Sequence, residues 1–86
     1  MTEADAPIPR VTLYGRPGCQ LCDEARDELL ALRDRGIGFE LREVNIEDDD
    51  RLLRAHLERI PVIEVDGAEV SALVPDTAAL RAALDP

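Results

Sequence analysis

Two cysteines three positions apart, Cys19 and Cys22, are the side chains of this sequence most suited to chemistry. Residues at this spacing share one face of a helix, so their sulfur atoms can come within bonding distance. A disulfide between them would close a loop of about four residues and add roughly 2 kcal/mol of stability, which is little for a structural bridge. In a chain whose first six residues do not resemble a secretory signal, this spacing indicates redox chemistry or a metal site instead.

The pair lies where a strand is expected to give way to a helix, with Cys19 at the helix start and Cys22 one turn further. Unpaired N–H groups and the helix dipole stabilise an anion there, and the thiolate is the reactive form of cysteine. Arg16 adds positive charge close to Cys19. Asp23 and Glu24, in the first turn of the expected helix, add negative charge but are expected to face solvent. We therefore expect Cys19 to attack a disulfide and the shielded Cys22 to resolve the mixed disulfide.

A metal site would need more ligands than the sequence offers. Structural zinc takes four, and His56 is the only further nitrogen ligand. We predict no metal site and expect His56 to be a boundary residue with a hydrogen-bonded ring. A metal or iron–sulfur carrier and a redox-inactive binding module remain the alternatives to redox chemistry.

Length and charge narrow the possible partners. The 86 residues allow one small domain, expected at 10–86 after a disordered leader at 1–9. With 19 acidic and 10 basic residues the net charge is -9, so we expect neither nucleic acid nor an anionic membrane as partner. All the cations are arginine, and without lysine a Schiff base or a P-loop lysine is excluded. No apolar run approaches the roughly 20 residues of a membrane-spanning helix.

Hydrophobic periodicity predicts seven elements in the order β-α-β-α-β-β-α. The strands are expected at 11–14, 39–46, 60–65 and 68–72, and the helices at 20–35, about 49–58, and from Asp76 or Thr77 onward. The strand–helix–strand unit favours parallel pairing of the first two strands, and Asp66-Gly67 is typical of a hairpin turn. The carboxylates at 47–50 are expected to cap the second helix. These elements predict a small mixed sheet with helices packed on it.

Two segments resemble the glutaredoxin branch of the thioredoxin-like superfamily, and especially the short bacterial glutaredoxin-like proteins. Residues 13–25 read LYGRPGCQLCDEA, and residues 60–67 read IPVIEVDG. The resemblance implies a thioredoxin-like fold in three α/β/α layers, with a cis peptide before Pro61 beside the dithiol. It also implies that Ile60 and Pro61 shape the substrate groove, where the backbone of Ile60 pairs with an extended substrate.

The resemblance suggests two further substrate-binding residues. Arg16 stands where glutaredoxins often carry a cation for a glutathione carboxylate, and Tyr14 lies on the cysteine side of the first strand. After the hairpin, Ser71-Ala72 replace the paired glycines of glutaredoxins and the acidic residue, Asp76, is displaced, so glutathione stays open as a co-substrate. Asp76 is better explained as a helix cap.

Together these features predict a cytoplasmic, monomeric thiol–disulfide oxidoreductase with no bound cofactor. Cys19 is the expected nucleophile and Cys22 the resolving residue. The expected substrate is a protein disulfide or a glutathione mixed disulfide, and an external reductant must close the cycle.

Overall fold

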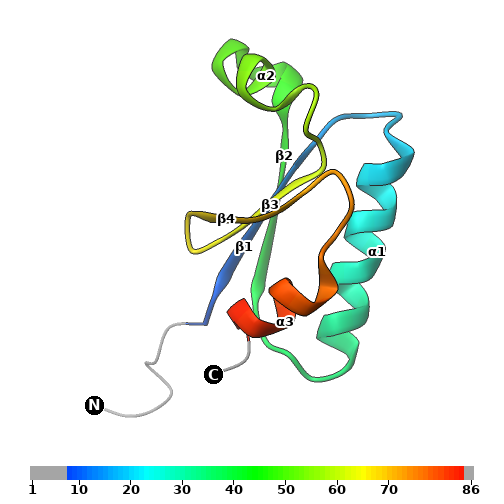
Figure 1. The fold of residues 1–86 in the computed structure, drawn as a ribbon, viewed down its shortest axis with the longest axis vertical. Coiled ribbons are helices and arrows are strands. Elements are labelled where there is room, and N and C mark those ends of the chain that lie inside the picture. The colour runs from blue at the N-terminus through cyan, green and yellow to red at the C-terminus, as the bar shows by residue number, and fades with distance from the viewer. Residues whose placement is uncertain (1–7, 85–86) are drawn as a thin grey trace.

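A four-stranded mixed sheet forms the centre of the computed structural model, which describes residues 8–84 (Figure 1). Its strands lie in the order β2-β1-β3-β4. They span β1 Arg10–Gly15, β2 Glu40–Asn45, β3 Val62–Val65 and β4 Ala68–Ala72. β1 pairs in parallel with β2 and antiparallel with β3, and β4 pairs antiparallel with β3. The predicted parallel unit and antiparallel hairpin are both confirmed.

Within the described residues, three α-helices and one 3₁₀ turn connect and cover these strands. They span α1 Gln20–Asp34, the 3₁₀ turn η2 Ile46–Asp48, α2 Asp50–His56 and α3 Thr77–Leu84. The predicted order of strands and α-helices is confirmed. None of the helices in this part of the chain is long and apolar enough to cross a bilayer.

The main core lies between one sheet face and the helices α1 and α3. Cross-strand partners share a face, so the pairs Val11–Val65 and Leu13–Ile63 point to the same side of the sheet. The buried residues packed against them are Ala25, Leu29 and Leu32 of α1, Leu80 and Leu84 of α3, and Phe39. This packing fixes the N-terminal end of α1 beside the end of β1.

Among the described residues, α2 covers the other face of the sheet, and it does so only near the end of the strands (Figure 1). No residue of α2 is fully buried, and Leu52 and Leu53 pack half-buried against the cluster around Cys22. Thr12 and Arg42, which are partners across β1 and β2, remain half-exposed and exposed on this face. The third layer of the predicted α/β/α arrangement is therefore one short helix.

Some predicted boundaries were wrong, for local reasons. The acidic stretch first forms the separate turn η2, because the Asn45 side chain accepts the N–H of Glu47 at 2.9 Å. Asp49 then caps α2 by accepting the N–H of Arg51 at 2.8 Å, and the helix ends at His56 rather than near 58. Of the predicted leader, residues 1–7 lie outside the described residues.

Candidate functional site

The two cysteines form a disulfide at the N-terminal end of α1, with Cα atoms 5.2 Å apart. Cys19 is the N-cap residue, and its sulfur accepts the backbone N–H of Cys22 at 3.1 Å. Sulfur here takes the place of the oxygen that usually satisfies a free N–H at a helix start. Cys19 is half-buried, whereas the side chain of Cys22 lies in the core and its residue is only 4% exposed.

The carboxylates of the first helical turn have partners away from the sulfur atoms. Asp23 lies 3.5 Å from Arg26, with a side chain that is mostly exposed. Glu24 accepts a hydrogen bond from Gln20 at 3.3 Å. Their exposure to water and salt weakens their opposition to a negative charge on Cys19.

Gly15, the last residue of β1, gives the Cys22 sulfur its space. A Cβ atom on Gly15 would lie 2.9 Å from the Cys22 Sγ and 3.1 Å from its Cβ. The strand predicted from the sequence ended at residue 14, so the prediction left Gly15 outside it and missed this contact. The only available signal was a glycine at the end of a strand, which can mark a close approach of another group.

The bond between Ile60 and Pro61 is cis, as the resemblance implied. Pro61 is fully buried, and Ile60 packs with Cys22 in a cluster that Cys19 and Tyr14 border. The N–H of Ile60 already donates to the His56 carbonyl at 3.0 Å. Within residues 8–84 no backbone donor pairs with the Ile60 carbonyl, whereas the Ile60 N–H already has its partner.

Tyr14 packs against the same cluster and contacts two other elements. Its hydroxyl donates to Glu64 at 3.1 Å, and its ring centroid is 4.8 Å from that of His56. Burial, and then the Glu64 carboxylate, raise the pKa of Tyr14 above its ordinary value. Both effects keep the hydroxyl protonated, because each disfavours a negative phenolate.

His56 was expected to have a fully hydrogen-bonded ring, and this is wrong for one atom. Its buried Nδ1 has no partner among the described residues, and its ring packs against the Tyr14 ring. Its backbone carbonyl instead accepts the N–H groups of Arg59 and Ile60. Among residues 8–84, no group of three or more His, Cys, Asp or Glu side chains is placed to hold a metal ion.

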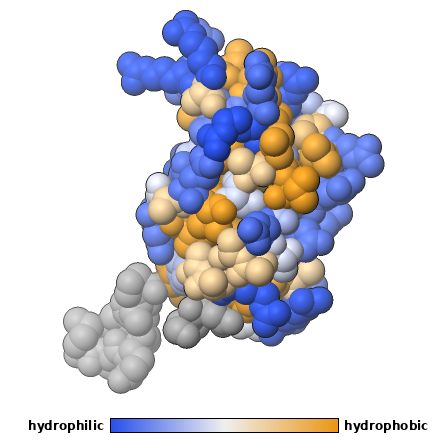
Figure 2. All heavy atoms as spheres, viewed as in Figure 1, coloured by the Kyte–Doolittle hydropathy of each residue, from blue (hydrophilic) through white to orange (hydrophobic). Residues whose placement is uncertain are grey.

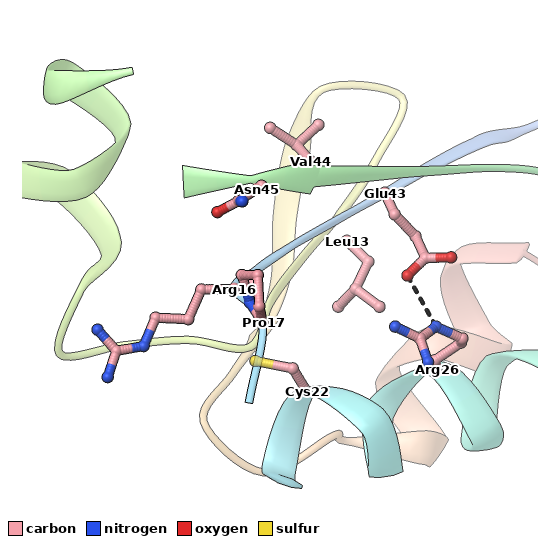
Figure 3. A pocket seen from close by; sticks show the side chains of 9 residues that line it. Leu13, Arg16, Pro17, Cys22, Arg26, Glu43, Val44 and Asn45 are labelled. Atoms are coloured by element: carbon pink, nitrogen blue, oxygen red, sulfur yellow. Dashed lines mark hydrogen bonds and ion pairs between the residues drawn. The ribbon is translucent and has the colours of Figure 1, made fainter. Parts of the chain in front are cut away.

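Arg16 lines a pocket of about 220 Å³ on the β2 side of Cys22 (Figure 3). Its side chain extends away from the Cys22 sulfur, and its Nη1 lies 3.9 Å from the Glu47 carboxylate. The ion pair between Arg26 and Glu43, at 2.7 Å, forms part of the opposite wall. Arg16 is thus brought next to the site with its guanidinium directed toward η2.

Ser71 and Asp76 hold the loop between β4 and α3. The Ser71 hydroxyl accepts the N–H of Asp76 at 2.9 Å and donates to the carbonyl of Val74 at 3.1 Å. The Asp76 carboxylate accepts the N–H of Ala79 at 3.0 Å. The helix-cap interpretation of Asp76 is confirmed.

Several solved structures share this fold. The NMR structure of protein Ne2328 from Nitrosomonas europaea matches with a TM-score of 0.83 and 29% identity, covering 93% of this chain and 95% of that chain. The X-ray structure of protein XcR50 from X. campestris matches with a TM-score of 0.67 and 38% identity, covering 87% of this chain and 95% of that chain. The oxidised thioredoxin of Plasmodium falciparum matches with a TM-score of 0.58 and 12% identity, covering 90% of this chain and 78% of that chain. At this identity the match shows the fold alone.

No curated protein matches the sequence. The family described as a glutaredoxin-like domain (DUF836) matches residues 10–85, which include every strand and helix of the structure. The thioredoxin-like neighbours, the disulfide-bonded pair at the start of α1 and the buried cis-proline agree with this match. The chain therefore belongs to the glutaredoxin-like (DUF836) domain family.

Proposed function

We propose that this protein is a thiol–disulfide oxidoreductase that reduces disulfides through Cys19 and Cys22. The observation that carries the proposal is the asymmetry of a bonded pair, with Cys19 reaching the surface and Cys22 buried at 4% exposure. An incoming disulfide can reach Cys19 first, while Cys22 is already within bonding distance for the second step. In the reduced protein, the Cys22 N–H would stabilise a thiolate on Cys19.

The proposed reaction is two successive exchanges. The Cys19 thiolate attacks one sulfur of the substrate disulfide, which forms a mixed disulfide and releases the other sulfur as a thiolate. Cys22 loses its proton and attacks the Cys19 sulfur, which releases the second substrate sulfur. Two electrons and the Cys22 proton have then passed from the cysteine pair to the substrate, which leaves as one thiolate and one thiol. A thiol reductant returns them by the reverse exchange.

In our proposal the groups around the pair bind the substrate, and the protein needs no resident cofactor. We propose that Ile60 offers its carbonyl to an extended substrate and that the buried Pro61, through its cis bond, fixes the direction of the Ile60 backbone. We propose that Tyr14 and Arg16 also contact the substrate. Tyr14 packs against the cluster around Cys22, and Arg16 lines the same pocket as Cys22. The proposed setting is a monomer in a reducing compartment such as the cytoplasm, where thiol reductants are present.

The first test assigns the roles of the two cysteines by variants. The proteins are the wild type, Cys19→Ser and Cys22→Ser. In one assay each reduced protein is mixed with hydroxyethyl disulfide, and reduction of this disulfide is measured. In a second assay the intact mass of each protein is measured in buffers with graded ratios of reduced to oxidised glutathione. We expect the wild type to lose two hydrogens at a defined ratio of reduced to oxidised glutathione. Cys22→Ser should hold one glutathione on Cys19, and Cys19→Ser should not reduce the disulfide. A Cys19→Ser protein of normal activity would refute the proposal.

A further inference from the structure

Three large hydrophobic side chains are exposed near the dithiol, Leu21, Leu73 and Val74, which we call the apolar rim. They are 44%, 48% and 70% exposed. The N–H of Leu73 lies 2.9 Å from the carbonyl of Pro61, so the β4–α3 loop is bound directly to the cis-proline segment. Because Ile60 of that segment packs against Cys22, the rim borders the reactive pair.

Leu21 lies on the side of α1 that faces this loop. It precedes Glu28 by two helical turns, and residues seven apart share a helix face. Glu28 accepts a hydrogen bond from Thr77 at 3.2 Å, which places the start of α3 against that face. Figure 2 shows hydrophobic atoms gathered where the loop meets the N-terminal end of α1.

The backbone of Leu73 is held in a conformation that suits glycine better than leucine. Its φ is 68°, in the left-handed region where a bulky side chain is a clear outlier. Hydrogen bonds from its N–H to the carbonyls of Arg59 and Pro61, together with the Ser71 contacts, keep it there. Such an unfavourable conformation suggests that the side chain has a function of its own. Here that side chain is presented to solvent beside the site.

Carboxylates without cationic partners flank the rim. Glu24 and Glu28 lie on α1 beside Leu21, and their side chains bond only to the neutral groups of Gln20 and Thr77 among the described residues. Neither forms an ion pair within residues 8–84. With a net charge of -9 on the whole chain, the field at this surface favours a cationic occupant and repels an anion.

We infer that the site takes a polypeptide disulfide whose cysteine is flanked by apolar and basic residues, in preference to glutathione disulfide. Apolar side chains of the substrate would cover Leu21, Leu73 and Val74, and its basic side chains would approach Glu24 and Glu28. Glutathione offers no large apolar side chain, and its net charge is negative. This inference rests on the proposed function and names its substrate class.

The test compares cysteine peptides that are all blocked as mixed disulfides with 2-mercaptoethanol. One peptide flanks the cysteine with Leu and Arg, one with Leu and Glu, and one with Ser and Arg, and glutathione is blocked in the same way. Reduced protein is mixed with each of these mixed disulfides, and the rate at which it reduces them is divided by its rate of reduction of hydroxyethyl disulfide. We call this ratio the relative rate. We expect the Leu–Arg peptide to react about tenfold faster than the others at low salt, in the range that electrostatic steering supplies.

Matched variants locate the effect on the protein. Leu73→Asn removes the apolar side chain and keeps a residue that tolerates the left-handed conformation, and Glu24→Gln removes one charge. Each should lower the relative rate of the Leu–Arg peptide several-fold. The controls are Leu30→Asn, from the opposite face of α1 with 37% exposure, and Asp34→Asn, from its far end; both should leave the relative rate unchanged.

Two results would overturn the inference. One is equal relative rates for all the peptides, and the other is a glutathione derivative that reacts as fast as the Leu–Arg peptide. A wild-type protein that does not reduce hydroxyethyl disulfide at all would refute the proposed function itself, and the inference with it. The two failures are therefore distinguishable by the reference reaction alone.

Discussion

Residues without reactive groups determine where the two sulfur atoms lie. Cys22 can occupy its buried position only because Gly15, at the end of β1, has no side chain there. Its backbone does not need a positive φ, so the constraint at Gly15 is purely the space taken by the sulfur. Protein interiors are close-packed, and a single added methyl group in such a contact is felt.

Gly15→Ala should therefore destabilise the fold. We expect a loss of about 1–3 kcal/mol in the free energy of unfolding, as for other overpacked cores, because the Cys22 side chain must shift. Urea unfolding followed by circular dichroism measures it. Gly38→Ala is the matched control, since its added Cβ meets no atom within 4 Å; it should be neutral or stabilise by up to about 1 kcal/mol. Equal stability of both variants would contradict the close contact.

The contrast between Cys19–Cys22 and Gly15 explains what a sequence can predict at this scale. Spacing within one helix brought the cysteines together, and it could be read directly from the order of residues. The contact between Gly15 and Cys22 joins a strand to a helix, and the ring of His56 meets Tyr14 from a different element. Such contacts depend on how elements pack, which no local pattern contains.

Helices α2 and α3 have similar lengths and similar caps but very different support. Asp49 caps α2 and Asp76 caps α3, each through its carboxylate and a backbone N–H two or three residues later. Leu80 and Leu84 anchor α3 in the main core, whereas no residue of α2 is fully buried. The sequence predicted both helices from their caps and apolar residues, but it did not indicate this difference in burial. A helix that buries little surface can open without unfolding the rest.

Removing each cap should reveal this difference. Asp76→Ala is expected to lower the free energy of unfolding by about 1 kcal/mol, the usual effect of losing an N-cap, and Asp76→Ser should restore most of it. Asp49→Ala should change the global value by less than about 0.5 kcal/mol, while amide hydrogen exchange in α2 becomes faster. Urea titration and residue-resolved exchange make the two measurements. Equal global losses for both alanine variants would show that α2 unfolds only with the core.

On the scale of the whole molecule, the excess of negative charge opposes the compact state. The molecule measures 24 and 18 Å along its two shorter axes, so charges on opposite sides across these axes lie within the screening length of about 30 Å at 0.01 M salt. At 0.15 M that length falls to about 8 Å, which removes most of the long-range repulsion. The surface ion pairs, such as Arg10–Glu40 and Arg26–Glu43, each contribute at most about 1 kcal/mol to stability. Salt weakens them less than it weakens the long-range repulsion, because their charged atoms are in direct contact.

Added sodium chloride should therefore stabilise the protein and at the same time slow its reaction with a basic peptide disulfide. Screening acts on both processes, but folding brings like charges together, whereas the proposed encounter brings opposite charges together. The urea midpoint and the rate of thiol–disulfide exchange with the basic peptide, measured over the same salt series, should therefore change in opposite directions. The variant with Asp34→Asn and Asp48→Asn has a net charge of -7 (-9 plus 2), and its urea midpoint should rise less with salt. A wild-type midpoint that falls with salt would mean that the ion pairs outweigh the repulsion.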